Sequence, residues 1–307
     1  MSIKSGYVSI IGKPNAGKST LLNALLGQKL SITTYKPQTT RKKITGILSE
    51  DDYQIVFLDT PGILKPKYLL QEKMLDAVKS SVRDADIIIY LADAGEVDQS
   101  KPNSEDVFLS YITPGTEQIR IGVINKADIS SPEAVDFLLN ALKEKNLFDE
   151  VLVISALNGF NVNQLKELLI SKLPEHPKYF PDEIVSDENE RFFVSEIIRE
   201  KILELYKEEI PYSTEVIIEE FTEREGRKDL IQAMIYVERN SQKGILIGKG
   251  GAAIKQLGER ARHDIEEFLD RPVYLELRVK VREDWRSNEQ YLKSFGYSDN
   301  ADSSEDN

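Results

Sequence analysis

The sequence predicts an α/β domain with a doubly wound sheet, followed by a smaller α+β domain. Apolar, β-prone runs alternate with helical segments over residues 4–173, which favours a mostly parallel sheet because parallel strands need helical crossovers. Residues 174–187 contain three prolines and no periodicity, so we expect a linker there. Residues 188–297 follow the order helix, strand, strand, helix, strand, which is typical of a compact α+β domain. The acidic stretch 298–307 is predicted to be a disordered tail.

The composition excludes several classes of site. The 307 residues include no cysteine, which rules out disulfides, thiol nucleophiles and zinc ribbons. Two histidines, His176 and His263, lie far apart in sequence and argue against a histidine-based triad or metal cluster. Without a signal peptide or a membrane-spanning run, we expect a cytoplasmic protein. A net charge of −12 disfavours unspecific nucleic-acid binding by the whole surface, although residues 239–262 carry six basic side chains and one acidic one.

A phosphate-binding loop follows the first predicted strand. The strand Tyr7–Ile11 leads into the pattern G-x-x-x-x-G-K-S and then into a helical segment over Thr20–Leu26. In this context backbone N–H groups and the helix N-terminus point at a phosphate. Lys18 can reach the β- and γ-phosphates, and the Ser19 hydroxyl can ligate Mg²⁺. The expected phosphate contacts are Gly12, Lys13, Pro14, Asn15, Ala16, Gly17, Lys18, Ser19 and Thr20.

The following segments complete the predicted sheet. Leu30–Arg41 has neither helical nor strand periodicity and is expected to be a mobile loop. Two β-prone runs over 43–48 and 54–59 form a predicted hairpin. Further helices are expected over 69–82, 104–111, 132–145 and 163–173, and further strands over 86–92, 118–124 and 151–154. Because ligands bind outside the carboxyl ends of strands in such sheets, the loops at these ends should converge on the phosphate-binding loop.

The run Asp59-Thr60-Pro61-Gly62 ends the second hairpin strand. Asp59 is placed to hold Mg²⁺, through a water, and the N–H of Gly62 can approach a γ-phosphate closely because glycine carries no side chain. The next residue is Ile63, where Ras-like proteins place a glutamine that orients the attacking water. Since isoleucine cannot direct a proton, we expect slow intrinsic hydrolysis of the γ-phosphate of a bound nucleotide.

The segments that follow two later predicted strands are expected to select the base of the nucleotide. In Asn125-Lys126-Ala127-Asp128 the final carboxylate can accept hydrogen bonds from the N1–H and 2-amino groups of guanine. Adenine lacks that pair of donors and would leave the carboxylate desolvated and unpaired. Asn125 can buttress the loop, and the stem of Lys126 can lie across the base. Backbone N–H groups of Ser155 and Ala156 would complete the base pocket.

Together these segments resemble the translation-factor-related GTPases, and Gln38–Arg41 resembles switch I of the Era family. The resemblance implies that Thr40 ligates Mg²⁺ in the GTP state, beside the serine of the phosphate loop and Asp59, with Thr39 as the second choice. Thr40 and Gly62, with the loop lysine, are then the residues expected to act in hydrolysis. The implied cofactors are GTP or GDP and Mg²⁺.

The asparagine at position 15 also resembles a loop residue that helps related GTPases bind a potassium ion near the phosphates. We therefore include K⁺ as a hypothesis among the cofactors. It predicts faster hydrolysis in potassium than in sodium.

A G-x-x-G loop is the informative feature of the second domain. The β-prone run Ile245–Ile247 leads in, a helix over Ala252–Leu269 leads out, and the surroundings are basic. KH domains present such a loop, whose glycines let a single-stranded backbone lie close. The residues expected to contact RNA are Gly248, Lys249, Gly250 and Gly251 in the loop, with Lys255, Arg239 and Lys243 as auxiliaries.

A G domain of this type followed by a type II KH domain is similar to the Era family over nearly the whole chain. This resemblance implies binding to the 3′ end of 16S rRNA, action in small ribosomal subunit assembly, and some peripheral membrane association. The expected function requires no stable homo-oligomer.

Two other function classes remain open at the level of sequence. A P-loop phosphotransferase acting on a small acceptor would need an arginine-rich lid and an acceptor pocket, and we find neither pattern. An RNA-binding scaffold with a vestigial nucleotide site is disfavoured because the phosphate and magnesium positions are intact. The leading hypothesis is a GTP-hydrolysing switch that gates RNA binding.

Overall fold

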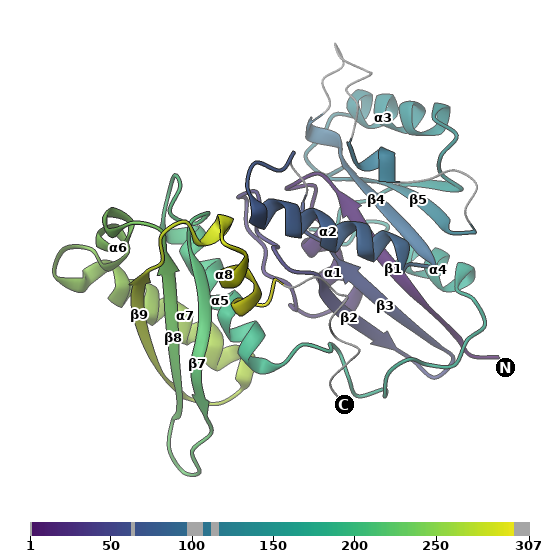
Figure 1. Ribbon diagram of the computed structural model, residues 1–307. Coiled ribbons are helices and arrows are strands. Elements are labelled where there is room, and N and C mark those ends of the chain that lie inside the picture. Colours follow the sequence, from purple (N-terminus) through teal and green to yellow (C-terminus); the bar gives the residue numbers. More distant parts are fainter. Residues whose placement is uncertain (1, 63–64, 97–106, 112–116, 298–307) are drawn as a thin grey trace. The chain divides into compact units, whose positions relative to one another are not determined.

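A computed structural model describes residues 2–62, 65–96, 107–111 and 117–297 (Figure 1). Through its internal contacts the chain divides into two compact units. Unit 1 comprises Met1–Pro66 and Met74–Asp187, and unit 2 comprises Lys67–Lys73 and Glu188–Asn307. Ile63, residues 104–106 of a predicted helix and the predicted tail 298–307 lie outside the described residues.

Unit 1 is built on a six-stranded sheet with the order β2-β3-β1-β4-β5-β6. The hairpin pair β2 and β3 is antiparallel and the other neighbouring pairs are parallel, which confirms the predicted fold class. The strands are β1 Lys4–Gly12, β2 Ile44–Ser49, β3 Tyr53–Asp59, β4 Ile87–Asp93, β5 Ile119–Asn125 and β6 Glu150–Val153. The helices are α1 Lys18–Leu26, α2 Leu69–Arg83, α3 Pro132–Glu144 and α4 Val162–Lys172, with short 3₁₀ turns η1 Ala94–Glu96 and η2 Val107–Tyr111.

Helices cover both faces of this sheet (Figure 1). Ile11 of β1 packs in a buried cluster with Val78 of α2 and Leu142 of α3. Helices α1 and α4 contact each other, and α1 also packs on β1, β2 and β3. A sheet buried on both faces explains why β4 is a continuous apolar run rather than an alternating one. Its carboxyl edge is left to the loops that follow β1, β3 and β5.

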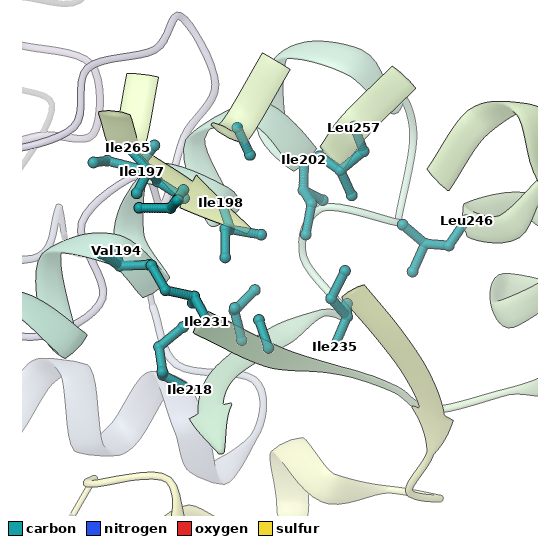
Figure 2. Close-up of a cluster of buried hydrophobic side chains, with 14 of the residues drawn as sticks. Val194, Ile197, Ile198, Ile202, Ile218, Ile231, Ile235, Leu246, Leu257 and Ile265 are labelled. Atoms are coloured by element: carbon teal, nitrogen blue, oxygen red, sulfur yellow. The ribbon is translucent and has the colours of Figure 1, made fainter. Parts of the chain in front are cut away.

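Unit 2 has a three-stranded sheet with the order β7-β8-β9, in which β7 and β8 are antiparallel and β8 and β9 are parallel. Its elements are α5 Glu190–Leu205, β7 Glu215–Thr222, β8 Asp229–Val237, α6 Asn240–Ile247, η3 Lys249–Gly251, α7 Ala252–Leu269, β9 Val273–Val281, η4 Trp285–Ser287 and α8 Glu289–Ser294. Figure 2 shows the core, where Ile198 and Ile202 of α5 face Ile235 of β8, Leu246 of α6 and Leu257 of α7. One sheet face and three helices therefore share a single apolar core.

One local expectation for unit 2 is corrected by the structure, and two short elements are added. The run Ile245–Ile247, expected to be β-prone, is the last turn of α6. The side-chain oxygen of Gln242 accepts the backbone N–H groups of Glu238 and Arg239, which caps this helix, and burial of Leu246 against the core favours it further. Near the end of the chain, η4 and α8 were not expected from the sequence.

The segment 174–187, expected to be a linker, belongs to unit 1 and is hydrogen-bonded to the rest of that unit over much of its length. The Gln54 side chain accepts the N–H groups of Tyr179 and Phe180 at 2.7 and 3.0 Å and donates to the Phe180 carbonyl. The Ser186 hydroxyl donates to the Thr45 carbonyl at 2.6 Å. The segment thus lies along β2 and β3, although it has no helix or strand of its own.

Candidate nucleotide-binding site and KH loop

The phosphate-binding loop joins β1 to α1, and its conformation requires glycine at position 17. Gly17 has a φ of +96°, and a Cβ there would lie 2.4 Å from the side-chain nitrogen of Asn125. That nitrogen donates to the Ala16 carbonyl at 2.8 Å. The loop is therefore held by β5, and α1 begins at Lys18 with its N-terminal N–H groups directed into the loop.

Lys18 is buried at the centre of this loop. Its ammonium donates to the carbonyls of Gly12 and Lys13 at 3.1 and 2.9 Å. Burial lowers the pKa of Lys18 to about 8, and the nearby Asp59 carboxylate opposes the shift. A cation desolvated in this way is stabilised by an anion, such as a phosphate, placed beside it.

Three oxygen donors meet next to Lys18. The Ser19 hydroxyl donates to Oδ2 of Asp59 at 2.7 Å and lies 2.9 Å from the Thr40 hydroxyl. Asp59 is fully buried, its Oδ1 has no hydrogen-bond partner among the residues that the structure describes, and burial raises its pKa. Hydroxyl and carboxylate oxygens are what Mg²⁺ prefers, so this donor set fits that ion. Thr39 instead donates to the Lys36 carbonyl at 2.7 Å, which leaves Thr40 as the threonine at this site.

A cavity of about 560 Å³ opens beside these residues, within the size range of small-ligand sites. The predicted residues that line it are Pro14, Asn15, Gly17, Lys18, Ser19, Thr20, Thr39, Thr40, Gly62, Asn125, Lys126 and Asp128. The lining residues that the sequence patterns did not indicate include Ile32, Thr33, Thr34 and Tyr35. They also include Ile129 and Leu157, which are 74% and 76% exposed. These two apolar side chains offer surfaces on which a flat base can pack.

The two loops expected to select the base are fixed by hydrogen bonds that reach across the sheet edge. Oδ1 of Asn125 accepts the Ala156 N–H at 2.9 Å, and the Ser155 N–H donates to the Phe160 carbonyl at 3.1 Å. In this structure both N–H groups, which we expected to complete the base pocket, donate to partners within the protein and hold the loop. Ala127 donates its N–H to the Ile154 carbonyl at 3.2 Å, which ties the loop after β5 to the end of β6.

Two further predicted residues take supporting positions. The Thr60 hydroxyl donates to the Ile10 carbonyl at 2.7 Å, so it fastens the end of β3 to β1. Lys126 has a φ of +65°, rare for a residue with a side chain, and its ammonium lies 2.5 Å from Oδ2 of Asp93. Asp93 was missed at the level of sequence, because nothing in its local pattern shows that the end of β4 lies beside Lys126.

In unit 2 the G-x-x-G loop lies between α6 and α7. Gly248 has a φ of +72°, and a Cβ there would lie 2.6 Å from the Cβ of Ala253, so the turn requires glycine. A Cβ at Gly250 or Gly251 would meet no atom within 4 Å, which leaves the loop backbone open on its outer side. Lys249 is exposed at its tip. Among the auxiliaries, Arg239 and Lys255 are exposed and Lys243 is half-buried.

Comparisons with known proteins match both domains. Residues 7–126 match the family described as 50S ribosome-binding GTPase, and residues 209–286 match the KH domain family. GTPase Era of Clostridium botulinum strain Hall is 45% identical over 294 residues, which cover 96% of this chain and 98% of that protein. The chain belongs to the Era family of GTPases. Geotalea daltonii GTPase Era is 46% identical over 95% of this chain and 97% of its own length.

Solved Era structures share the fold. A crystal structure of Era in complex with MgGDPNP and nucleotides 1506–1542 of 16S ribosomal RNA matches with a TM-score of 0.90 and 41% identity, covering 96% of this chain and 99% of that one. An Aquifex aeolicus Era variant bound to GDP·AlF₄⁻ also has a TM-score of 0.90 and 41% identity, with 96% and 100% coverage. Family membership confirms the predicted G domain followed by a KH domain.

Proposed function

We propose that this Era-family GTPase is a nucleotide-dependent switch that binds the 3′ end of 16S rRNA through its KH domain and acts in small ribosomal subunit assembly. The observation that carries the nucleotide half is the single cavity that Lys18, Ser19, Thr40 and Asp128 line together. A phosphate cradle and a guanine-selective carboxylate on one cavity account for GTP better than for ATP.

The roles of the residues follow from this geometry. Lys18 and the N-terminus of α1 neutralise negative charge on the β- and γ-phosphates. Ser19, Thr40 and Asp59 would hold Mg²⁺, which supplies further positive charge to the same oxygens. Gly62 places a backbone N–H next to the γ-phosphate. None of these residues is a general base for water, which is consistent with a low intrinsic rate.

Potassium dependence is a separate part of the proposal. Asn15 has a φ of +63°, and its side-chain nitrogen donates to the Tyr35 carbonyl at 3.0 Å. The side-chain oxygen and the carbonyl of this pair are hard donors suited to a monovalent cation. Hydrolysis that runs faster in potassium than in sodium at equal ionic strength supports this role, and equal rates contradict it.

For the RNA half, the open backbone of the G-x-x-G loop and the six basic residues over 239–262 support a phosphate backbone contact. Era in one solved complex is bound to nucleotides 1506–1542 of 16S rRNA. The small ribosomal subunit, a cytoplasmic location and peripheral membrane association are proposed from family resemblance. No helix in the part of the chain that the structure describes could span a bilayer.

The test measures binding of a labelled RNA with the sequence of the 16S rRNA 3′ end, with a non-hydrolysable GTP analogue and with GDP. The double variant Lys249→Asp, Gly250→Asp should lose binding, because it places two carboxylates at the phosphate contact. The matched control is Gly226→Asp, Lys228→Asp in the β7–β8 turn, where Gly226 also has a positive φ and free space around it. Equal RNA binding in both nucleotide states would contradict the nucleotide-dependent switch. An equal loss of RNA binding in both double variants would contradict the role of the G-x-x-G loop as the RNA contact.

A further inference from the structure

A buried serine that belongs to none of the sequence motifs contacts the proposed magnesium ligand Asp59. The Ser31 hydroxyl donates to Oδ2 of Asp59 at 3.1 Å, and Ser31 is fully buried. The same oxygen accepts the Ser19 hydroxyl at 2.7 Å, while Oδ1 has no hydrogen-bond partner within the described part of the chain. One oxygen of the carboxylate is thus fixed twice by the protein, and the other is left for a ligand.

The position of Ser31 is itself fixed by α1. The side-chain oxygen of Asn23 accepts the N–H groups of Leu30 and Ser31, both at 2.9 Å. Its side-chain nitrogen donates to the Ser31 carbonyl at 2.8 Å. Three hydrogen bonds from one helical residue therefore hold the backbone on both sides of the serine, and they involve neither the phosphate loop nor Thr40.

We propose that Ser31 is a positioning residue for the magnesium site, and that Asn23 is the residue that fixes Ser31. The Ser31 hydroxyl keeps the Asp59 carboxylate from rotating, so that Oδ1 stays available to a water of the magnesium shell. Hydrogen bonds to a ligating group raise metal affinity by orienting it before the metal arrives. The inference rests on the proposed magnesium site, and it adds a residue outside the five segments of the first domain that carry the family resemblance.

The test follows release of a fluorescent GDP analogue from the full chain as the Mg²⁺ concentration is varied. This measures binding of the ion with the nucleotide and requires no hydrolysis. Loss of an outer hydrogen bond to a metal ligand weakens metal binding by about 10-fold to 100-fold. We expect Ser31→Ala to raise the Mg²⁺ concentration that half-maximally slows release by about 10-fold, with little change in release when Mg²⁺ is absent.

The matched control is Ser9→Ala. Ser9 is also fully buried in unit 1, and its hydroxyl donates to the hydroxyl of Ser81, likewise at 3.1 Å. The control removes the same atom from a comparable site that does not touch Asp59, so its Mg²⁺ dependence should match the wild type. A second variant, Asn23→Asp, leaves the serine hydroxyl intact but loses the donor to the Ser31 carbonyl, and it should shift the Mg²⁺ dependence in the same direction.

The outcomes separate this inference from the function it rests on. Wild-type release that does not respond to Mg²⁺ overturns the proposed magnesium site and the role of Ser31 with it. A wild type that responds, with Ser31→Ala and Asn23→Asp responding identically to it, overturns the role of Ser31 alone. An equal shift in Ser9→Ala also overturns it, because the effect would then belong to any buried hydroxyl.

Discussion

Nucleotide affinity should fall as the pH rises above 8, because Lys18 loses its proton in the nucleotide-free protein. Burial holds the pKa of Lys18 at about 8 in the absence of phosphate. Bound phosphates favour the ammonium and raise that pKa, so binding above pH 8 requires proton uptake. The protonated fraction falls from about 0.9 at pH 7 to about 0.14 at pH 8.8, which predicts a roughly sevenfold loss of affinity, about 1 kcal/mol.

The assay is titration of the nucleotide-free chain with a fluorescent GDP analogue at several pH values and constant ionic strength. The range ends at pH 8.8 because the guanine N1–H, one of the donors to be recognised, begins to ionise above it. Lys18→Met is the control and should bind weakly with a flatter pH profile, since it has no proton to gain. Wild-type affinity that is constant between pH 7 and 8.8 would refute the reasoning, because the buried amine would then be charged throughout.

Three further predictions concern contacts elsewhere in the chain. Asp93→Asn should weaken GDP binding by about 1 kcal/mol, roughly fivefold, because Lys126 loses its charged partner; equal affinity by titration would contradict this. Ile198→Ala should lower the free energy of unfolding by about 2–5 kcal/mol in denaturant melts, since it leaves a cavity in the core of unit 2, and a loss below 1 kcal/mol would contradict it. Burial by itself would raise the pKa of Asp229, but hydrogen bonds from the Arg224 backbone and the Arg271 side chain outweigh it and lower the pKa in the folded state. The contribution of Asp229 to stability is therefore present above pH ~4 and is lost as the pH falls through the folded pKa. Asp229→Asn should therefore flatten the loss of melting temperature below pH 4, and an unchanged acid profile would show that Asp229 does not contribute to it.

The motifs that recognise the nucleotide could be predicted because each is a local pattern with a local function. The spacing from Gly12 to Ser19 encodes a turn and a helix start within eight residues, and the expected strand and helix occur there. The failure at Ile245–Ile247 has the opposite cause. Three apolar residues, two of them β-branched, favour a strand by propensity. The helix is favoured instead by the cap that Gln242 provides and by the core residues against which Leu246 packs, and both lie outside the run.

The sequence by itself determined the fold class, the positions of the phosphate loop and the G-x-x-G loop, and the carboxylate proposed to select the base, since these depend on residue type and short-range spacing. Only the tertiary structure decided which groups support them. Asn125 fixes the loop at Ala16 from 109 positions away, Asp93 pairs with Lys126, and Ser31 contacts Asp59 from a loop without periodicity. Such contacts join loops and strand ends that are far apart in the sequence. They leave no periodic pattern in the sequence, because the edge of the sheet is assembled only when the strands pair in register.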